Sequence, residues 1–317
     1  FYPSLHRVLQ GTPMAAVRID YDAVFAGRDI THVQDRVTGM DPDTHQIQLE
    51  NGALSYETCV VAVGSETSYG SIDGEGNVHD LRFRDDTEAV TARVRDRSLD
   101  QVVVIGGGAT GVEATASLYE ASDQLDDFGI TLLEGADRLL PRFTAAVGTA
   151  VDTAYRDRGI DVRTGAFVDR IGEDCVVLQD GTEIDTDLTV WAGGVAPRPV
   201  TADLGLDHTD DGIPVDDYMR AADDVYVVGD AATYEGKVNR AFYAIMEAKT
   251  AAGNITRSRA GKPLNEHEVG WDPNLLHLGP WNALFELNGH IWCGRVPALM
   301  RRIGVEQRYL WTRRHLL

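Results

Sequence analysis

The sequence predicts an α/β fold in which helices cover a parallel β-sheet. Three features near the middle of the chain support this: a β-branched apolar run, a glycine-rich turn, and a helical pattern leading to a second apolar run. The first run is Val102–Ile105, and a short uninterrupted apolar run is typical of a strand buried on both faces. The second run is Ile130–Leu133, so strand, helix and strand follow one another as in a parallel βαβ unit.

The glycine-rich turn between these runs fits the pattern G-x-G-x-x-G. Gly106 permits a tight turn out of the strand, Gly108 lets a pyrophosphate approach the backbone, and Gly111 lets the helix pack closely on the strand. The helix begins near Ala109 and Thr110, where free N–H groups and the positive end of the helix dipole attract phosphates. We therefore predict a Rossmann-like dinucleotide site, with an unliganded glycine-rich turn as the alternative.

An acidic residue, Glu134, follows the second strand, 23 positions after Gly111. A carboxylate at the carboxyl end of that strand can accept hydrogen bonds from ribose hydroxyls. Because it would repel a 2′-phosphate, Glu134 favours NAD(H) over NADP(H) as the ligand.

The other elements are predicted from apolar patterns and turn residues. Before the central motif we expect a short helix within Val17–Phe25, a strand at Asp29–Gln34, a hairpin turn at Asn51–Gly52, a buried strand at Cys59–Val63 and a helix at Asp85–Arg97. After it we expect a helix at Ala145–Asp157, strands at Ile160–Thr164, Ala166–Ile171, Cys175–Leu178, Glu183–Trp191 and Val225–Val228, and a helix at Asn239–Arg259.

The composition indicates the environment in which the protein works and the classes of partner that it disfavours. The formal net charge is −21, and the chain has only three lysines, so we expect a protein adapted to high salt, with an ordinary acidic cytoplasmic protein as the alternative. This charge disfavours nucleic-acid binding. The three cysteines form no C-x-x-C pair, which fits a reducing cytoplasm and indicates neither a zinc site nor a redox disulfide. No apolar run is long enough for a spanning helix.

The C-terminal segment, residues 295–317, differs in character from the rest of the chain. It holds six arginines against one glutamate, with apolar residues and a tryptophan between them. A basic amphipathic segment of this kind suits an anionic membrane surface. The alternatives are docking on the acidic body of the chain itself or on the second subunit of a homodimer.

Taken in order, these motifs resemble the glutathione-reductase-like flavoproteins, which have two dinucleotide-binding domains. Within that superfamily the chain resembles the type II NADH dehydrogenases, which are NADH:quinone oxidoreductases. The resemblance covers nearly the whole chain. It is carried by Val61–Ser65, Val102–Glu113, Leu133–Glu134 with Leu139–Pro141, Asp180–Gly181, Trp191–Val195 and Val225–Ala232.

The resemblance implies FAD and NADH as cofactors. It implies that Asp230 hydrogen-bonds the ribityl and phosphate part of FAD, with Gly64, Gly229 and Ala241 near the flavin. It also implies a pocket for the nicotinamide at Ala192, Gly193 and Gly194. Glu113 is the implied catalytic acid beside the nicotinamide, Glu247 is a second catalytic candidate, and the C-terminal segment is the implied membrane contact on the cytoplasmic face.

The resemblance implies that the chain is divided into four segments. Residues 1–78 and 195–260 are the expected parts of the FAD-binding domain, residues 79–194 the NAD(H)-binding domain, and residues 261–317 a C-terminal appendage. The resemblance implies a strand and a further G-x-G-x-x-G motif at the start of the FAD-binding domain, but Phe1 already lies past that point, so this βαβ unit is expected to be missing. The expectation is either a fragment or a crippled FAD site.

The residues at the expected acceptor site depart from the pattern that the resemblance implies. The resemblance implies two glutamines on the helix after Gly229–Asp230, but Phe242 and Met246 stand there and become the expected quinone pocket. A soluble reductase with another acceptor and an NADH-binding redox sensor are the alternatives. A sulfide:quinone reductase is disfavoured because it needs a reactive cysteine pair.

Overall fold

The structure is a computed structural model that describes residues 6–9, 13, 19–81, 84–95, 99–122, 129–268 and 274–304. The chain divides into two compact units, which are described one at a time. Unit 1 holds the described parts of residues 1–30, 69–194 and 273–317, and unit 2 holds those of residues 31–68 and 195–272.

Unit 1 is built on a parallel five-stranded sheet with the strand order β6-β13-β7-β8-β9. Its strands are β6 (His79–Asp80), β7 (Gln101–Ile105), β8 (Gly129–Glu134), β9 (Asp161–Thr164) and β13 (Leu188–Trp191). Its helices are α1 (His6–Leu9), α2 (Tyr21–Phe25), α3 (Arg84–Arg95), α4 (Ala109–Ser122) and α5 (Ala145–Arg156), with a 3₁₀ turn at Glu75–Asn77. The predicted α/β class and the central βαβ unit are therefore confirmed.

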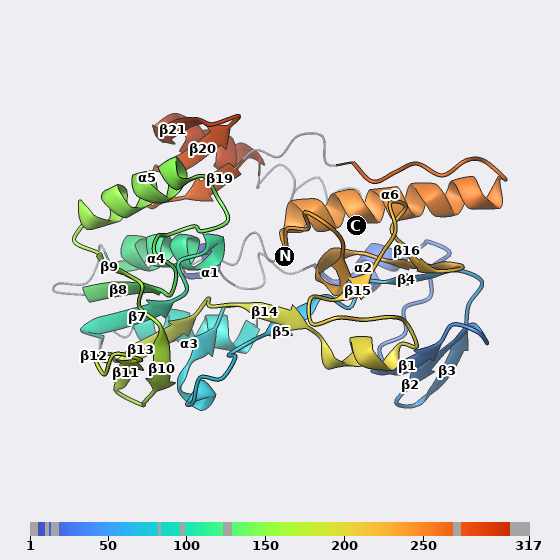
Figure 1. The fold of residues 1–317 in the computed structure, drawn as a ribbon, viewed down its shortest axis with the longest axis horizontal. Coiled ribbons are helices and arrows are strands. Elements are labelled where there is room, and N and C mark those ends of the chain that lie inside the picture. The colour runs from blue at the N-terminus through green and yellow to red at the C-terminus, as the bar shows by residue number, and fades with distance from the viewer. Residues whose placement is uncertain are drawn as a thin grey trace. The chain divides into compact units, whose positions relative to one another are not determined.

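The sheet of unit 1 is buried on both faces, as the apolar runs predict. Val102 and Val104 pack into a core with the helices, whereas Val103 and Ile105 pack into a second core on the opposite face. Figure 1 shows α4 and α5 on one face and a three-stranded antiparallel sheet on the other. That second sheet consists of β10 (Val168–Ile171), β11 (Cys175–Leu178) and β12 (Glu183–Asp185).

The prediction of one strand over Glu183–Trp191 is wrong. The segment is split into β12, in the antiparallel sheet, and β13, in the parallel sheet. At the break, the Thr186 hydroxyl donates to the carbonyl of Leu188 (2.9 Å). The Asp187 carboxylate accepts from the N–H groups of Asp100 and Gln101 (2.8 and 2.9 Å). These local bonds let the chain leave one sheet and enter the next.

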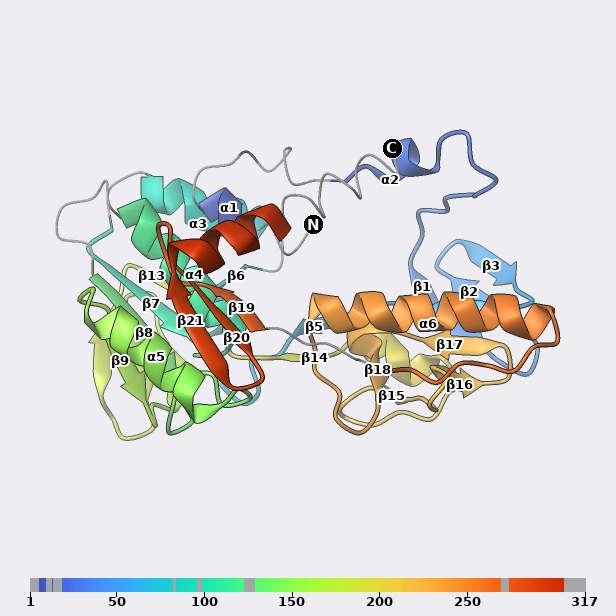
Figure 2. The same ribbon diagram turned by 90° about the horizontal axis from the view of Figure 1, so that it is seen from above.

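An antiparallel meander and a helical segment complete unit 1. The meander consists of β19 (Asn274–His277), β20 (Ala283–Leu287) and β21 (His290–Gly294), and residues 295–304 are helical. Leu276, Leu278 and Leu284 join the core that contains α4. Figure 2 shows the helical segment in red beside this meander.

Unit 2 combines two short parallel strand pairs, β4 (Cys59–Val61) with β17 (Val225–Val227) and β15 (Ile213–Pro214) with β18 (Ala232–Thr233), with short antiparallel pieces. Strand β17 also pairs antiparallel with β16 (Arg220–Ala222). The other elements are β1 (Val37–Asp41), β2 (Gln46–Leu49), β3 (Gly52–Ser55), β5 (Ser65–Thr67), β14 (Val195–Pro197), two 3₁₀ turns at Pro199–Asp203 and Gly229–Ala231, and α6 (Ala241–Arg259). Ala251 of α6 packs into the core that includes β4 and β17.

The predicted strand at Asp29–Gln34 is wrong. Residues 29–34 form no strand, and Ile30 and Val33 in that segment are about half exposed, because their spacing of three does not place them on one face of a strand. The compact units divide at 30/31, 68/69, 194/195 and 272/273. The predicted functional domains, with boundaries at 78/79, 194/195 and 260/261, stay a prediction. Among the described residues, no helix is long and apolar enough to cross a membrane.

Candidate functional site

The glycine loop of unit 1 connects the end of β7 to the start of α4. Gly106 has φ +107°, and a Cβ there would lie 2.4 Å from the carbonyl oxygen of Ala192. At Gly111 a Cβ would lie 1.7 Å from the carbonyl oxygen of Gly106, so both positions require glycine. Gly108, in contrast, has no atom within 4 Å of its Cβ position. The loop therefore packs tightly against neighbouring backbone at Gly106 and Gly111, and it leaves space at Gly108, where a pyrophosphate would approach.

The first turn of α4 supplies the N–H groups that the motif needs. The first helical hydrogen bond is made by Val112 N to the carbonyl of Gly108 (2.9 Å). The N–H groups of Ala109, Thr110 and Gly111 precede that bond, at the positive end of a 14-residue helix. These residues fit a bound diphosphate.

Glu134 lies beside the glycine loop, at the carboxyl end of β8. One of its carboxylate oxygens, Oε2, accepts from the Gly107 N–H (2.8 Å), and the other, Oε1, accepts from the Ala136 N–H (2.8 Å). Each carboxylate oxygen has two lone-pair positions, so the group keeps capacity for ribose hydroxyls. Both backbone bonds fix the carboxylate where the sequence motif requires it.

Ala192, Gly193 and Gly194 follow β13 at the same edge of the sheet. The Ala192 N–H donates to the carbonyl of Ile105 (2.7 Å), so this turn lies directly beside the start of the glycine loop. Gly193 and Gly194 are exposed. Ligands of open α/β sheets bind at the carboxyl ends of the strands. The structure therefore brings every predicted NADH-binding residue to one edge of unit 1.

Unit 2 assembles the residues that were assigned to FAD. Gly64 follows β4 with φ +70° and open space at its Cβ position. The neighbouring Ser65 hydroxyl donates to the Asp230 carboxylate (2.6 Å), which joins the ends of the two parallel strands. Both features fit part of a flavin site, since the backbone is approachable and the carboxylate is held. Sequence reasoning included Ser65 in the motif Val61–Ser65 but assigned it no role.

Glu247 lies on α6 in the same unit and is fully buried. Its carboxylate accepts from the Gly229 N–H (2.6 Å), the Tyr234 hydroxyl (2.8 Å) and Lys237 Nζ (2.5 Å). The Tyr234 hydroxyl also lies 3.4 Å from His267 Nε2. Ala241 begins the same helix and is exposed. Sequence reasoning named Glu247 but not its partners, which come from the preceding segment 229–237.

Burial shifts the pKa values of two residues in this cluster, Tyr234 and His267. It raises the pKa of Tyr234 well above its ordinary value, and the hydrogen bond to Glu247 acts in the same direction. Burial also lowers the pKa of His267, partly offset by the nearby Glu247. Both shifts favour the uncharged forms near neutral pH.

Glu113, on the second turn of α4, is held by the C-terminal part of unit 1. Its Oε1 accepts from the His277 backbone N–H and from Arg301 Nη2, both at 2.9 Å. Arg301 is nearly buried, although the sequence placed it in a surface-binding segment. The predicted role of Glu113 beside the nicotinamide stays a prediction.

The quinone-pocket candidates Phe242 and Met246 are both half-buried near the start of α6. The Phe242 ring meets Tyr243 edge-on, with centroids 6.3 Å apart.

Of the basic segment 295–317, residues 305–317 lie outside the described residues.

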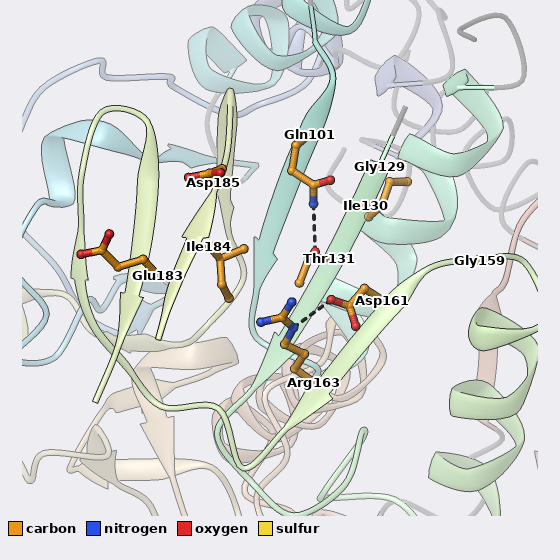
Figure 3. Close-up of a pocket in the computed structure, with 10 residues that line it drawn as sticks. All are labelled: Gln101, Gly129, Ile130, Thr131, Gly159, Asp161, Arg163, Glu183, Ile184 and Asp185. Carbon is orange, nitrogen blue, oxygen red and sulfur yellow. Dashed lines mark hydrogen bonds and ion pairs between the residues drawn. The ribbon is translucent and has the colours of Figure 1, made fainter. Parts of the chain in front are cut away.

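A hollow at the opposite end of the sheet in unit 1 is shown in Figure 3. It is lined by the first residues of β7, β8 and β9 together with β12. Its polar side chains include two pairs, Arg163 with Asp161 (2.8 Å) and Gln101 with Thr131 (2.9 Å). Because it lies at the amino ends of the strands, it is not the dinucleotide site.

Comparison with known proteins supports this geometry. A family model described as pyridine nucleotide-disulphide oxidoreductase matches residues 9–253. The chain belongs to this family. Membership of the pyridine nucleotide-disulphide oxidoreductases confirms the predicted cofactors, FAD and NAD(H). The three cysteines of the chain all lie in described residues and form no disulfide.

Individual family members differ in their acceptors. The chain is 30% identical over 219 residues to the type II NADH:quinone oxidoreductase of Haemophilus influenzae, covering 63% of this chain and 49% of the relative. It is 29% identical over 255 residues to putidaredoxin reductase CamA of Pseudomonas putida, covering 74% and 58%. The chain thus spans about half the length of the curated relatives it matches.

Solved structures agree on the fold. The structure of NDH2 from Plasmodium falciparum in complex with NADH has a TM-score of 0.85 at 17% identity, covering 100% of this chain and 89% of that one. The ferredoxin reductase for the CYP199A2 system from Rhodopseudomonas palustris has a TM-score of 0.77 at 24% identity, covering 89% and 71%.

Proposed function

We propose that the chain acts as an FAD-dependent NADH dehydrogenase that passes electrons to a quinone. The observation that carries the NADH part is the position of Glu134, fixed by two backbone bonds beside the glycine loop. Similarity to a type II NADH:quinone oxidoreductase supports the quinone part.

One set of residues binds NADH and a second set binds FAD. Gly108 and the first turn of α4 bind the diphosphate of NADH, and Glu134 binds a ribose. Asp230, oriented by Ser65, holds the ribityl chain of FAD. When bound, FAD supplies the ring that accepts hydride and releases two electrons to the acceptor. Glu113 remains our candidate for the acid beside the nicotinamide, with Arg301 fixing its carboxylate.

Association with an anionic membrane surface belongs to this proposal. Within the helical residues 295–304, four apolar side chains are 45–70% exposed at spacings that share one face: Val296, Leu299, Met300 and Ile303. Arg295 and Arg302 are exposed as well. An exposed apolar stripe with flanking arginines is suited to the interface of an anionic bilayer.

An iron–sulfur protein is the second candidate acceptor. Phe242 and Met246 stand where the resemblance to type II enzymes implies glutamines, and putidaredoxin reductase is among the similar proteins. This reading makes the chain a reductase of a small redox protein.

An anaerobic NADH titration of the full-length protein tests the proposal. We expect NADH to bleach the visible flavin absorbance and a soluble quinone to restore it. Recovery with a ferredoxin but not with the quinone would favour the second candidate. Absence of bound flavin in the full-length protein, or bleaching that neither acceptor reverses, would contradict the proposed dehydrogenase.

A further inference from the structure

The starting point is the backbone of Gly229, the residue before the flavin-binding candidate Asp230. Gly229 has φ +71°, a left-handed conformation. Its N–H donates to Glu247 Oε2 (2.6 Å), and its carbonyl accepts from Lys237 Nζ (2.9 Å). Glu247 and Lys237 also pair with each other at 2.5 Å. One buried ion pair therefore hydrogen-bonds both the backbone N–H and the backbone carbonyl of Gly229.

The environment makes this arrangement specific. The Glu247 side chain is 0% exposed and that of Lys237 is 9% exposed. Lys237 Nζ also lies over the Tyr234 ring, 5.2 Å from its centroid, and the Tyr234 hydroxyl donates to Glu247. A buried carboxylate with three donors and a buried ammonium with defined acceptors have little freedom to rearrange.

We propose that the Glu247–Lys237 pair is a positioning element that fixes Gly229 and so directs Asp230 toward the flavin. This inference rests on the proposed function, in which Asp230 binds FAD. The pair sets the path of the backbone at Gly229, while the Ser65 hydroxyl fixes the Asp230 carboxylate from the other side. Glu247 and Lys237 are then not catalytic residues: they act on the flavin through Gly229 and Asp230.

The choice of variants follows from the cost of burying charge. Removing one partner of a buried pair leaves an uncompensated charge and destabilises the fold, whereas apolar residues of similar volume in place of both are often tolerated. The informative change is therefore the double variant Glu247→Leu/Lys237→Met. The single variant Glu247→Gln keeps an oxygen for the Gly229 N–H. Glu235→Gln and Lys249→Met are matched controls, because both residues are exposed on the same loop and helix.

The test is a fluorescence titration of the full-length protein, stripped of flavin, with FAD, together with the visible spectrum and the thermal unfolding of each variant. We expect the double variant to bind FAD about tenfold more weakly or worse, because the charged acceptor on Asp230 is misplaced. Its bound flavin should show a shifted visible spectrum. Glu247→Gln should lie between the double variant and the parent, and both controls should match the parent.

Two further results separate the inference from its premise. Asp230→Ala should weaken FAD binding at least as much as the double variant. If Asp230→Ala leaves FAD affinity unchanged, the assignment of Asp230 fails and the inference falls with it. If Asp230→Ala weakens binding but the double variant, folded by circular dichroism, binds FAD within about twofold of the parent, the positioning role alone is overturned. Should the double variant fail to fold, Glu247→Gln decides the question: an FAD affinity below that of the parent and the controls but above that of Asp230→Ala would support the inference. An affinity and spectrum equal to those of the parent, or a loss as large as that of Asp230→Ala, would overturn it.

Discussion

Glu134 carries the choice of nicotinamide cofactor through two properties, its negative charge and its fixed position beside Gly107. We predict that Glu134→Ala weakens NADH binding by about tenfold, because hydrogen bonds to a charged group are worth about 1.5–3 kcal/mol. Use of NADPH should improve relative to NADH, since the repulsion of a 2′-phosphate is removed.

Steady-state kinetics with both nucleotides check this prediction. Glu134→Gln is the comparison variant, because it keeps the shape of the side chain while it removes the charge and replaces one of the two acceptor oxygens by an amide NH2. Unchanged NADH and NADPH kinetics in the alanine variant would rule out a ribose-binding role for Glu134.

Substitution by alanine should affect stability differently at two glycines of the loop, Gly111 and Gly108. At Gly111 the new methyl group would meet the backbone of Gly106, so we predict a loss of stability of about 1–3 kcal/mol. At Gly108 the methyl group enters open space, so stability should change by less than about 1 kcal/mol while NADH affinity falls. Urea unfolding and an NADH titration of both variants measure the contrast. Equal effects on stability would contradict it.

At the scale of elements, the helical segment 295–304 offers a direct test of surface binding. We predict that Leu299→Glu/Ile303→Glu lowers sedimentation with phosphatidylglycerol vesicles by about tenfold or more, since burying one such side chain is worth about 1.5–3 kcal/mol. Stability should be little affected, because both side chains are about half exposed.

Leu54→Glu is the matched control for this experiment. It makes the same exchange at an exposed leucine of β3, in the other unit. If the double variant and Leu54→Glu sediment with vesicles as the parent does, the helical segment is not the membrane contact.

Sequence patterns predicted the elements whose signals are local. The runs that form β7 and β8 are buried on both faces, and the glycine spacing reflects contacts within a few residues. The break at Thr186 and Asp187 was missed because alternation continues through it, while the chain changes its pairing partners. The bonds from Ser65 to Asp230 and from Arg301 to Glu113 join residues 165 and 188 positions apart. No spacing rule for a helix or strand reports such contacts.

At the scale of the whole molecule, the dominant property is a formal net charge of −21. Self-repulsion of this size opposes compactness, and salt weakens it as the screening length falls from about 10 Å at 0.1 M to about 3 Å at 1 M. We predict that the thermal unfolding midpoint rises between 0.1 and 1 M KCl. The rise should be smaller in Asp207→Asn/Asp210→Asn/Asp211→Asn, which removes three exposed carboxylates from one surface loop. A midpoint that is flat or falls with KCl would contradict adaptation to salt.

The route of the chain through unit 1 has a consequence for synthesis on the ribosome. Most of its sheet and helices are complete by Gly194, but Leu276, Leu278 and Leu284 of its main core come only after the second part of unit 2 has been made. At translation rates of about 5–20 residues per second, the roughly eighty intervening residues take about 4–16 s to emerge. Throughout that interval the nascent chain displays the apolar surface that these leucines later cover. This surface makes the nascent chain a natural client for chaperones that hold partly folded proteins.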